Sequence, residues 1–192
     1  MSQGSDAIHI NVGQNDAVVL RGLTLNGSNV SFAGIDLVAG GSLTIINCVV
    51  QNFEEGIFIE PASGTVNVVI RNTVASNNAS DRGIAIDPSV GANVSAVIDH
   101  VLATGNTYGI TIGGSNTGPS AVAISDSIFS NNVTGIGSFG TNVKVLLGSS
   151  VITNNADIGV LNSAATFHTY GNNQVNLNGT DIFGGPPTRH SC

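Results

Sequence analysis

The sequence predicts an all-β fold, a right-handed parallel β-helix of about seven coils. Two recurrences indicate this fold. Apolar residues align at intervals of 23 to 28 residues, through Leu20, Ile45, Ile70, Ile98, Ile124, Leu147 and, less regularly, Tyr170. A Gly-Ile pair recurs between them, as in Gly56-Ile57 and Gly83-Ile84. A repeat of this length is typical of solenoids, in which residues one period apart become neighbours in adjacent coils.

The stretch 66–88 contains one complete unit. Apolar residues occupy every second position from Val66 to Ile70, which predicts a strand with one buried face. Ser76-Asn77-Asn78 is typical of a tight turn, and Gly83-Ile84-Ala85-Ile86 predicts a second strand that ends before Pro88. A propeller blade needs about 40 residues, and a leucine-rich repeat has a different leucine pattern, so a β-helix remains.

The repeats predict one domain with short ends. We expect start residues without a repeat partner at 1–6, the β-helix at 7–183 and a flexible tail at 184–192. Ala7-Ile8-His9-Ile10-Asn11 matches the second strand of a coil, so the chain enters the solenoid halfway round. Solenoid ends usually carry caps, and we therefore expect an uncapped N-terminal end that self-associates through its strand edges.

Charge and composition exclude several classes of partner. The net charge is −7, with five Lys and Arg residues in 192 and no basic cluster. Nucleic acids and anionic membranes are therefore not expected partners, because both are bound through Lys and Arg. The start of the chain has no signal-peptide pattern, and no apolar run approaches the roughly 20 residues of a spanning helix. Cys48 and Cys192 form neither a disulfide framework nor a metal-binding spacing.

The repeat resembles that of bacterial right-handed parallel β-helix proteins of the pectin-lyase-like superfamily, from Ala7 to Ile182. The resemblance implies a secreted or cell-surface location. Val97-Ile98-Asp99-His100 is similar to the Trp-Ile-Asp-His stretch of pectate lyases, without its tryptophan. Those enzymes also use a carboxylate cluster for Ca²⁺ and a catalytic arginine, whereas Arg71 is expected to form a surface ion pair with Asp99. The motifs of polygalacturonases are absent.

One column of polar residues falls at the end of the repeated strand, through Asn47, Asn72, His100, Asp126 and Ser149. We expect these residues at a bend or partly inside, with His100 close enough to hydrogen-bond Asn72 and Asp126. A His–Asp pair is half of a nucleophile-activating triad. The alternative is a structural polar ladder, in which each side chain satisfies the next. The ladder is favoured because nothing marks a neighbouring hydroxyl as activated.

A second candidate is the group of acidic residues in coils two and three, namely Glu54, Glu55, Glu60, Asp81 and Asp87, together with Arg82. Glu60 and Asp87 share a column, each preceded by Ile and followed by Pro. Two carboxylates about 5 Å apart match the pair of a retaining glycosidase, with Glu60, Asp87 and Arg82 as candidate catalytic residues. The same pair is a possible Ca²⁺ site. The third alternative is a solvated acidic edge in which Arg82 screens Glu55.

The outward column through His9, Asp36, Phe58, Ala85, Thr111 and Gly137 carries an aromatic residue. Phe58 and Tyr108 are candidates for stacking on sugar rings, with Glu54 and Glu55 as polar neighbours. The sequence therefore favours a non-catalytic extracellular or surface module, structural or weakly carbohydrate-binding, with polysaccharide as its possible partner and without a required cofactor. The alternative is a polysaccharide-active lyase or hydrolase of the pectin-lyase-like group.

Overall fold

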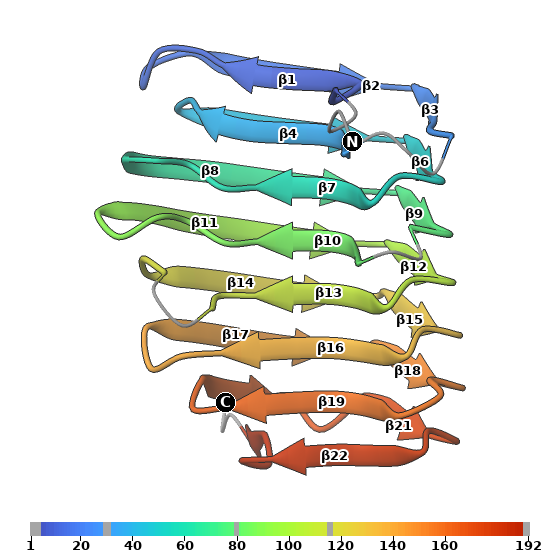
Figure 1. The fold of residues 1–192 in the computed structure, drawn as a ribbon. Coiled ribbons are helices and arrows are strands. Elements are labelled where there is room, and N and C mark those ends of the chain that lie inside the picture. The colour runs from blue at the N-terminus through green and yellow to red at the C-terminus, as the bar shows by residue number, and fades with distance from the viewer. Residues whose placement is uncertain (1–4, 29–31, 79–80, 115–116, 190–192) are drawn as a thin grey trace.

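The computed structural model describes residues 5–28, 32–78, 81–114 and 117–189. Over these ranges the chain is all β, without helix, and winds into a parallel β-solenoid of about seven coils. The coils stack from β1 at the top of Figure 1 to β22 at the bottom, so each sheet runs the length of the molecule. The predicted fold class is confirmed. Within the described ranges, no helix is long and apolar enough to cross a membrane.

Each coil contributes one strand to each of three parallel sheets, and the described residues give the following bounds. The first sheet contains β1 (Ile8–Asn11), β4 (Ala33–Ala39), β7 (Glu55–Ile59), β10 (Arg82–Ile86), β13 (Tyr108–Ile112), β16 (Thr134–Phe139), β19 (Ile158–Ser163) and β22 (Thr180–Gly184). The second contains β2 (Ala17–Arg21), β5 (Ser42–Ile46), β8 (Gly64–Arg71), β11 (Ala92–Asp99), β14 (Ser120–Ser125), β17 (Val143–Gly148), β20 (Thr166–Thr169) and β23 (Thr188–Arg189). The third contains β3 (Thr24–Asn26), β6 (Val49–Gln51), β9 (Val74–Ser76), β12 (Leu102–Thr104), β15 (Ile128–Ser130), β18 (Val151–Thr153) and β21 (Gln174–Asn176).

The strand register confirms the two predicted recurrences. Leu20, Ile45, Ile70, Ile98, Ile124 and Leu147 pair in one file across the second sheet. The Gly-Ile pairs form a file across the first sheet, from Ile35 through Ile57 and Ile84 to Val160. The last predicted position is wrong by one residue, because Leu147 pairs with Thr169 and not with Tyr170.

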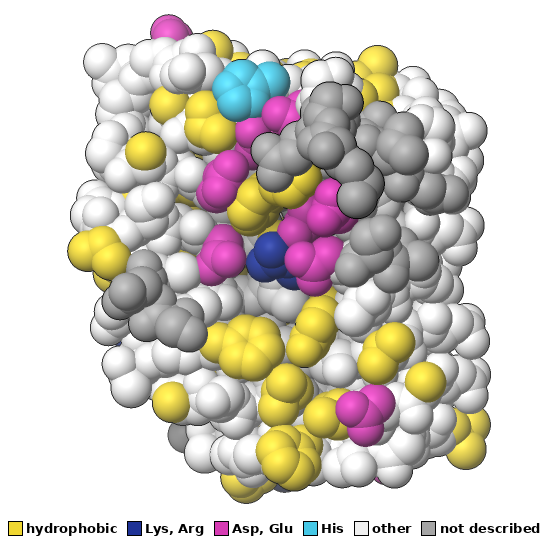
Figure 2. Space-filling model, in the orientation of Figure 1, with side chains coloured by type: hydrophobic (Ala, Val, Ile, Leu, Met, Phe, Trp, Pro, Cys, Tyr) yellow, Lys and Arg dark blue, Asp and Glu magenta, His cyan; other side chains and the backbone are white. Residues whose placement is uncertain are grey.

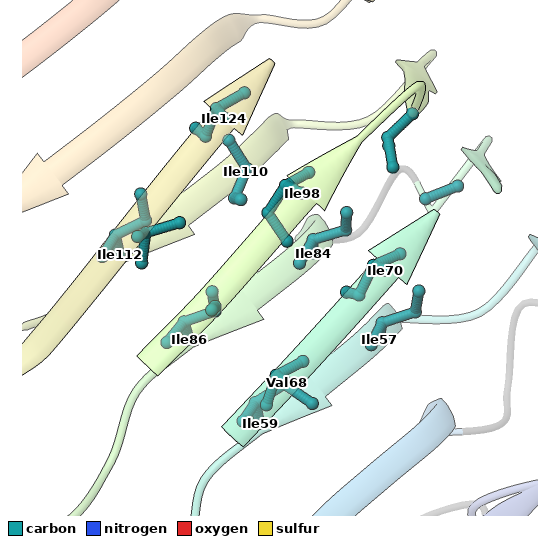
Figure 3. Close-up of a cluster of buried hydrophobic side chains, with 14 of the residues drawn as sticks. Ile57, Ile59, Val68, Ile70, Ile84, Ile86, Ile98, Ile110, Ile112 and Ile124 are labelled. Atoms are coloured by element: carbon teal, nitrogen blue, oxygen red, sulfur yellow. The ribbon is translucent and has the colours of Figure 1, made fainter. Parts of the chain in front are cut away.

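The core lies between the facing strands of the first and second sheets. Ile57 and Ile59 of β7 lie opposite Val68 and Ile70 of β8, and the pattern repeats in the next coils (Figure 3). These side chains are essentially fully buried. Aliphatic side chains fill most of this narrow space, with Phe167 in the last coil as an exception, which is consistent with the low aromatic content of the chain.

Residues with left-handed backbone make two of the corners of each coil. The corner between the second and third sheets is formed by Gly22, Asn47, Asn72, His100, Asp126, Ser149 and Gly171, with φ between 48° and 77°. The corner after the third sheet is formed by Asn52, Asn77, Gly105, Asn131, Asn154 and Leu177. Asn, Asp and Gly adopt this conformation with the least strain, and the corners are accordingly rich in these residues.

A buried asparagine ladder connects the coils beside the second corner, through Asn78, Asn106, Asn132, Asn155 and Asn178. The Oδ1 atom of Asn132 accepts a hydrogen bond from the backbone N–H of Asn106 at 3.0 Å and another from its side-chain amide at 3.1 Å. The Asn132 amide donates in turn to the carbonyl oxygen of Ala103 at 3.1 Å. The ladder therefore satisfies buried turn backbone that regular strand pairing does not reach.

From Gly56 onward, the glycine that precedes the inward-facing residue of each first-sheet strand makes room for this ladder. A Cβ atom on Gly83 would lie 2.8 Å from the side-chain nitrogen of Asn106 and 2.8 Å from the carbonyl oxygen of Gly109. Both distances are shorter than ordinary van der Waals contact, so a side chain here would displace the neighbouring coil. The recurrence of Gly before Ile follows from this close approach.

The C-terminal end differs from the predicted boundary. Thr188 and Arg189, expected in a flexible tail, form β23 and pair with His168 and Thr169 of β20. Residues 190–192 lie outside the described residues, as do 1–4. Asp6, expected among the start residues without a repeat partner, accepts a hydrogen bond from the backbone N–H of Ala33 at 3.1 Å.

The asparagine ladder yields a stability prediction. Replacing Asn132 with Ala should lower the free energy of unfolding by about 2–4 kcal/mol, because buried donors and acceptors in two neighbouring coils lose their partners. Asn67→Ala, on the exposed face of β8, is the matched control and should change it by less than about 0.5 kcal/mol. Urea denaturation followed by circular dichroism measures both. Equal losses would contradict a stabilising role for the ladder.

Candidate functional site

The outward face of the first sheet carries the largest gathering of ionisable side chains in the described structure. Its central file, His9, Asp36, Phe58, Ala85, Thr111 and Gly137, pairs as predicted in neighbouring coils. Figure 2 shows acidic side chains around a single basic one in the upper half of this face, with hydrophobic side chains below. We call the group Asp36, Glu55, Glu60, Asp81, Arg82 and Asp87 the acidic strip.

Arg82, at the start of β10, is the centre of the acidic strip. Its Nη2 atom lies 2.6 Å and its Nε atom 2.9 Å from Oε1 of Glu55, which precedes it by one coil. Its Nε is also 3.2 Å from Asp81, and its Nη1 is 3.4 Å from Asp87. The structure thus joins four of the predicted residues in one ion-pair network. Glu54 is exposed and lies outside this network.

Phe58 points outward as predicted, but it is covered. The guanidinium carbon of Arg82 lies 5.4 Å from the centre of its ring, and Phe32 packs edge-on against it at 6.0 Å between centroids. Only 8% of Phe58 is exposed, so its ring is occupied by protein contacts and offers little surface to a sugar. Tyr108 is more accessible and packs edge-on against Phe139, with centroids 6.4 Å apart.

Glu55 is the most buried carboxyl group of the strip, with 2% of the residue exposed. Burial raises its pKa to about 8, and the guanidinium of Arg82 opposes that rise. One of its oxygens, Oε2, has no hydrogen-bond partner among the described residues. Glu55 is therefore held by Arg82 in a poorly solvated place, and removing Arg82 would leave a buried group without its counter-charge.

Glu60 and Asp87 occupy the same position in adjacent coils. The backbone N–H of Glu60 bonds to Leu37 and that of Asp87 to Ile59, which places the two residues about 4.8 Å apart along the stack. Burial raises the pKa of Glu60, and the charges of Asp36 and Asp87 raise it further. Asp87 Oδ1 is buried and, within the described part of the chain, unpaired. The pair thus brings together two carboxyl groups, and the pKa of one of them, Glu60, is raised.

The two residues do not complete a three-ligand metal cluster. Among the described residues, groups of three potential ligand atoms within 4.8 Å of one another occur at Asp6, His9 and Asp36, and at Asp99, His100 and Asp126. Neither group contains Glu60 or Asp87. A Ca²⁺ ion at these two carboxylates remains a prediction.

The predicted polar ladder is a column of corner residues whose side chains face solvent. Asn47, Asn72, His100, Asp126 and Ser149 are all exposed, and all have positive φ. The expectation of a bend is confirmed, but the expectation that these residues lie partly inside is wrong. A corner with left-handed backbone favours asparagine and aspartate, and so does a buried hydrogen-bonded ladder. The sequence pattern is therefore similar in the two cases, which explains why an exposed corner was predicted to lie partly inside.

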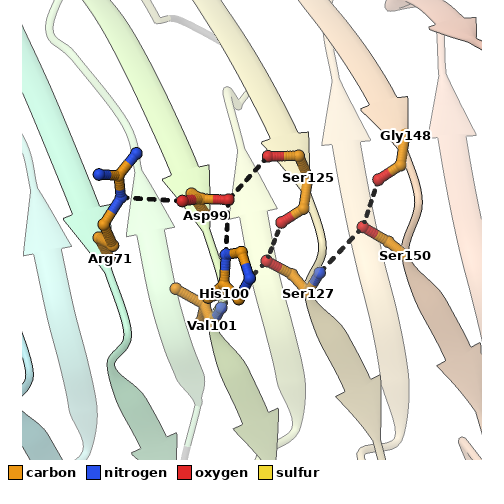
Figure 4. A network of polar contacts seen from close by, with 8 residues as sticks. All are labelled: Arg71, Asp99, His100, Val101, Ser125, Ser127, Gly148 and Ser150. Carbon is orange, nitrogen blue, oxygen red and sulfur yellow. Dashed lines mark hydrogen bonds and ion pairs between the residues drawn. The ribbon is translucent and has the colours of Figure 1, made fainter.

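The side chains that do form buried ladders lie elsewhere. One position further along, Ser127 accepts a hydrogen bond from the Val101 N–H at 3.1 Å, and Ser150 accepts one from the Ser127 N–H at 3.2 Å (Figure 4). The ring of His100 turns to the neighbouring Asp99, with Nδ1 2.9 Å from Oδ1. Asp99 also pairs with Arg71 at 2.8 Å, the ion pair expected from the sequence.

Sequence reasoning overlooked three residues near the acidic strip, namely Asp6, His9 and Asp36 as a charged group. Asp36 is 3% exposed, and its Oδ2 lies 2.8 Å from Nδ1 of His9. His9 and Asp36 occupy equivalent positions in adjacent repeats, and this alignment could have predicted that the two side chains lie together. Asp6 precedes the first repeat and had no column from which to place it.

The raised pKa of Glu55 predicts how stability changes with pH. A carboxyl group whose folded-state pKa exceeds its unfolded value contributes most below the unfolded pKa and loses that contribution as pH rises to the folded value. The melting temperature should therefore fall between about pH 4.5 and pH 8. Glu55→Gln should flatten this decline, whereas Glu54→Gln, at the exposed neighbour, should leave it unchanged. Thermal melts across this range measure the effect, and parallel curves for all three proteins would contradict it.

Comparison of the chain with protein-family models, with curated proteins and with solved structures found no match. The parallel β-solenoid is established by the strand pairing alone. What the chain binds or transforms must therefore be inferred from the residues on its surface, and the acidic strip with the aromatic pair below it is the most developed arrangement there.

Proposed function

We propose that the protein is a non-catalytic module that binds extended carbohydrate along the outward face of the first sheet. The observation that carries this proposal is the continuous file on that face, where the acidic strip is followed by Tyr108 and Phe139. Coils stacked at about 4.8 Å present side chains at regular intervals, which suits a chain of repeating sugar units. Aromatic rings offer apolar surface, and carboxylates accept hydrogen bonds from hydroxyl groups.

The charge of the strip indicates the class of sugar. Five carboxyl residues surround one arginine, and that arginine already contacts three of them. A polyanionic chain would meet repulsion here, so neutral or amino-containing polysaccharides are the proposed ligands. The resemblance to bacterial pectin-lyase-like proteins supports a secreted or surface location, in which the module also serves a structural role.

Binding to a panel of soluble polysaccharides tests this function. Isothermal titration should detect neutral or amino polysaccharides in preference to pectate. Tyr108→Ala should weaken binding roughly 3- to 10-fold, corresponding to about 0.5–1.5 kcal/mol for an aromatic contact. Val97→Ala, at an exposed position on the second sheet, is the control and should bind as the wild type does. Preferential binding of pectate without Ca²⁺, or equal effects of the two substitutions, would contradict the proposed face.

A second function is favoured by the Glu60–Asp87 pair. One carboxyl group with a raised pKa beside a second carboxylate is the arrangement that glycoside hydrolysis uses for a general acid and its partner. Nη1 of Arg82 lies 3.4 Å from Oδ2 of Asp87, which places a positive charge beside the pair. The alternative proposal is therefore a polysaccharide-active hydrolase or lyase in which Glu60 donates the proton and Asp87 acts as nucleophile or base.

Product release distinguishes this alternative from simple binding. Assays for new reducing ends and for unsaturated products, with and without Ca²⁺, should stay at background if the module is non-catalytic. If products form, Glu60→Gln and Asp87→Asn should each lower the rate at least about 100-fold, the usual contribution of acid–base catalysis. Glu54→Gln is the control. Activity that survives both substitutions would exclude this pair as the catalytic residues.

A further inference from the structure

His9 lies between two carboxylates at the upper end of the acidic strip. Its Nδ1 atom is 2.8 Å from Oδ2 of Asp36 and 3.2 Å from Oδ2 of Asp6. One ligand atom from each residue lies within 4.8 Å of the others. The three residues come from three places, since Asp6 precedes β1, His9 is in β1, and Asp36 is in β4 of the next coil. Strand pairing of His9 with Asp36 fixes the arrangement.

Asp36 carries an oxygen that this arrangement leaves unsatisfied. The residue is 97% buried, and its Oδ1 atom has no hydrogen-bond partner among the described residues. Its other oxygen is directed at His9, so the carboxylate faces the cluster. A buried carboxylate oxygen without a partner is unfavourable, because it has lost its hydration without gaining a hydrogen bond. A cation held between the three side chains would remove that penalty.

The carboxyl groups around the cluster would also be stabilised by a positive charge. Asp6 and Asp36 bring two carboxyl groups to one imidazole nitrogen, at 3.2 Å and 2.8 Å. Asp36 and Asp6 both raise the pKa of Glu60, in the next coil. Stacked carboxylates thus repel one another across three coils. Asp6 is oriented by the Ala33 N–H, which donates to its Oδ1 and directs its Oδ2 toward His9.

We propose that Asp6, His9 and Asp36 form a binding site for a divalent transition-metal ion, with Zn²⁺ as the preferred member of that class. An imidazole nitrogen with two carboxylate oxygens is a donor set that suits Zn²⁺, whereas Ca²⁺ takes oxygen ligands alone. Three protein ligands leave a fourth position for water. The ion would tie the first coil to the second through Asp36. The site lies at the upper end of the proposed carbohydrate-binding face and shares Asp36 with the acidic strip. Its test measures metal binding alone and does not depend on carbohydrate binding.

A second cluster with similar residues serves as a control. Asp99, His100 and Asp126 also bring three potential ligand atoms within 4.8 Å. The oxygens of Asp99 are satisfied, however, by Arg71 at 2.8 Å, His100 at 2.9 Å and Ser125 at 3.0 Å. His100 and Asp126 are exposed corner residues. A carboxylate already paired with arginine has little to gain from a metal, so this cluster should not bind one.

Isothermal titration of the full chain, stripped with a chelator, against ZnCl₂ tests the proposal. The wild type should bind one equivalent in the micromolar range or tighter. His9→Gln and Asp36→Asn should each weaken binding at least about 10-fold, while His100→Gln should not change it. His9 has a half-exposed side chain, so His9→Gln is expected to fold even if Asp36→Asn does not. Zn²⁺ should also raise the melting temperature of the wild type but not of His9→Gln.

Three outcomes would overturn the site. The first is no heat of binding for the wild type at about 100 μM Zn²⁺, far above the affinities of protein zinc sites. The second is Zn²⁺ binding that His9→Gln leaves intact or that His100→Gln removes. The third is binding of Ca²⁺ alone, unaffected by His9→Gln but lost in Glu60→Gln, which would place an oxygen-only site at Glu60 and Asp87 instead.

Discussion

Hydrogen bonds between successive coils hold each residue about 4.8 Å from its counterpart one turn away, and every other property of this protein depends on that constraint. It turns positions 23 to 28 residues apart into direct neighbours. For apolar residues the effect is favourable, because Ile45, Ile70, Ile98 and Ile124 form one continuous buried file. For charged residues the same spacing brings like charges together, as at Glu60 and Asp87, unless a counter-charge intervenes.

Arg82 shows how the fold accommodates this conflict. Its guanidinium contacts carboxylates from two adjacent coils and covers the ring of Phe58, so a single cation compensates several stacked acids. Where no arginine is available, at Asp6 and Asp36, one histidine lies between the carboxylates, and a buried oxygen remains unpaired. The carboxylates around Arg82 therefore have a counter-charge, whereas the negative charge around His9 is less fully balanced. The first group is a structural ion-pair network, and the second is the site proposed to receive an ion.

The repeat in the sequence was sufficient to predict the fold and most of the register. Ile-to-Ile spacing and the Gly-Ile pairs placed Ile57 beside Ile84 and Phe58 beside Ala85 in adjacent coils, as the structure has them. The repeat was not sufficient to predict which corner side chains are buried and which are exposed. Asn72 and Asn78 both follow a strand in the same coil, yet Asn72 is an exposed corner with left-handed backbone, whereas Asn78 is fully buried in the ladder. The composition of the two columns is alike because both conformational strain and backbone hydrogen bonding favour asparagine.

The same limit applied to the candidate site. Alignment of the sequence repeats grouped Glu60 with Asp87 and Glu55 with Arg82. The alignment does not show how far an outward side chain is buried by its neighbours. Phe58 and Glu55 point away from the core and are nevertheless buried, because Phe32 and Arg82 lie over them. Phe32 precedes β4, in a connecting segment whose length varies from coil to coil, and Arg82 is the first residue of β10. The alignment of the repeats alone does not show that either residue covers its neighbour.

The asparagine ladder has one further property. Within the series each asparagine bonds to its equivalents in the preceding and following coils. At the first rung Asn78 accepts from the backbone N–H of Phe53 at 3.0 Å, and at the last rung Asp181 takes the place of the next asparagine, accepting from Asn178 at 2.9 Å. A whole turn of the solenoid could thus be inserted or excised between two asparagines without leaving any amide in the series unmatched. Tandem duplication of such a segment would lengthen the molecule while conserving its internal chemistry, which makes growth by whole turns the most accessible route of evolutionary change for this architecture.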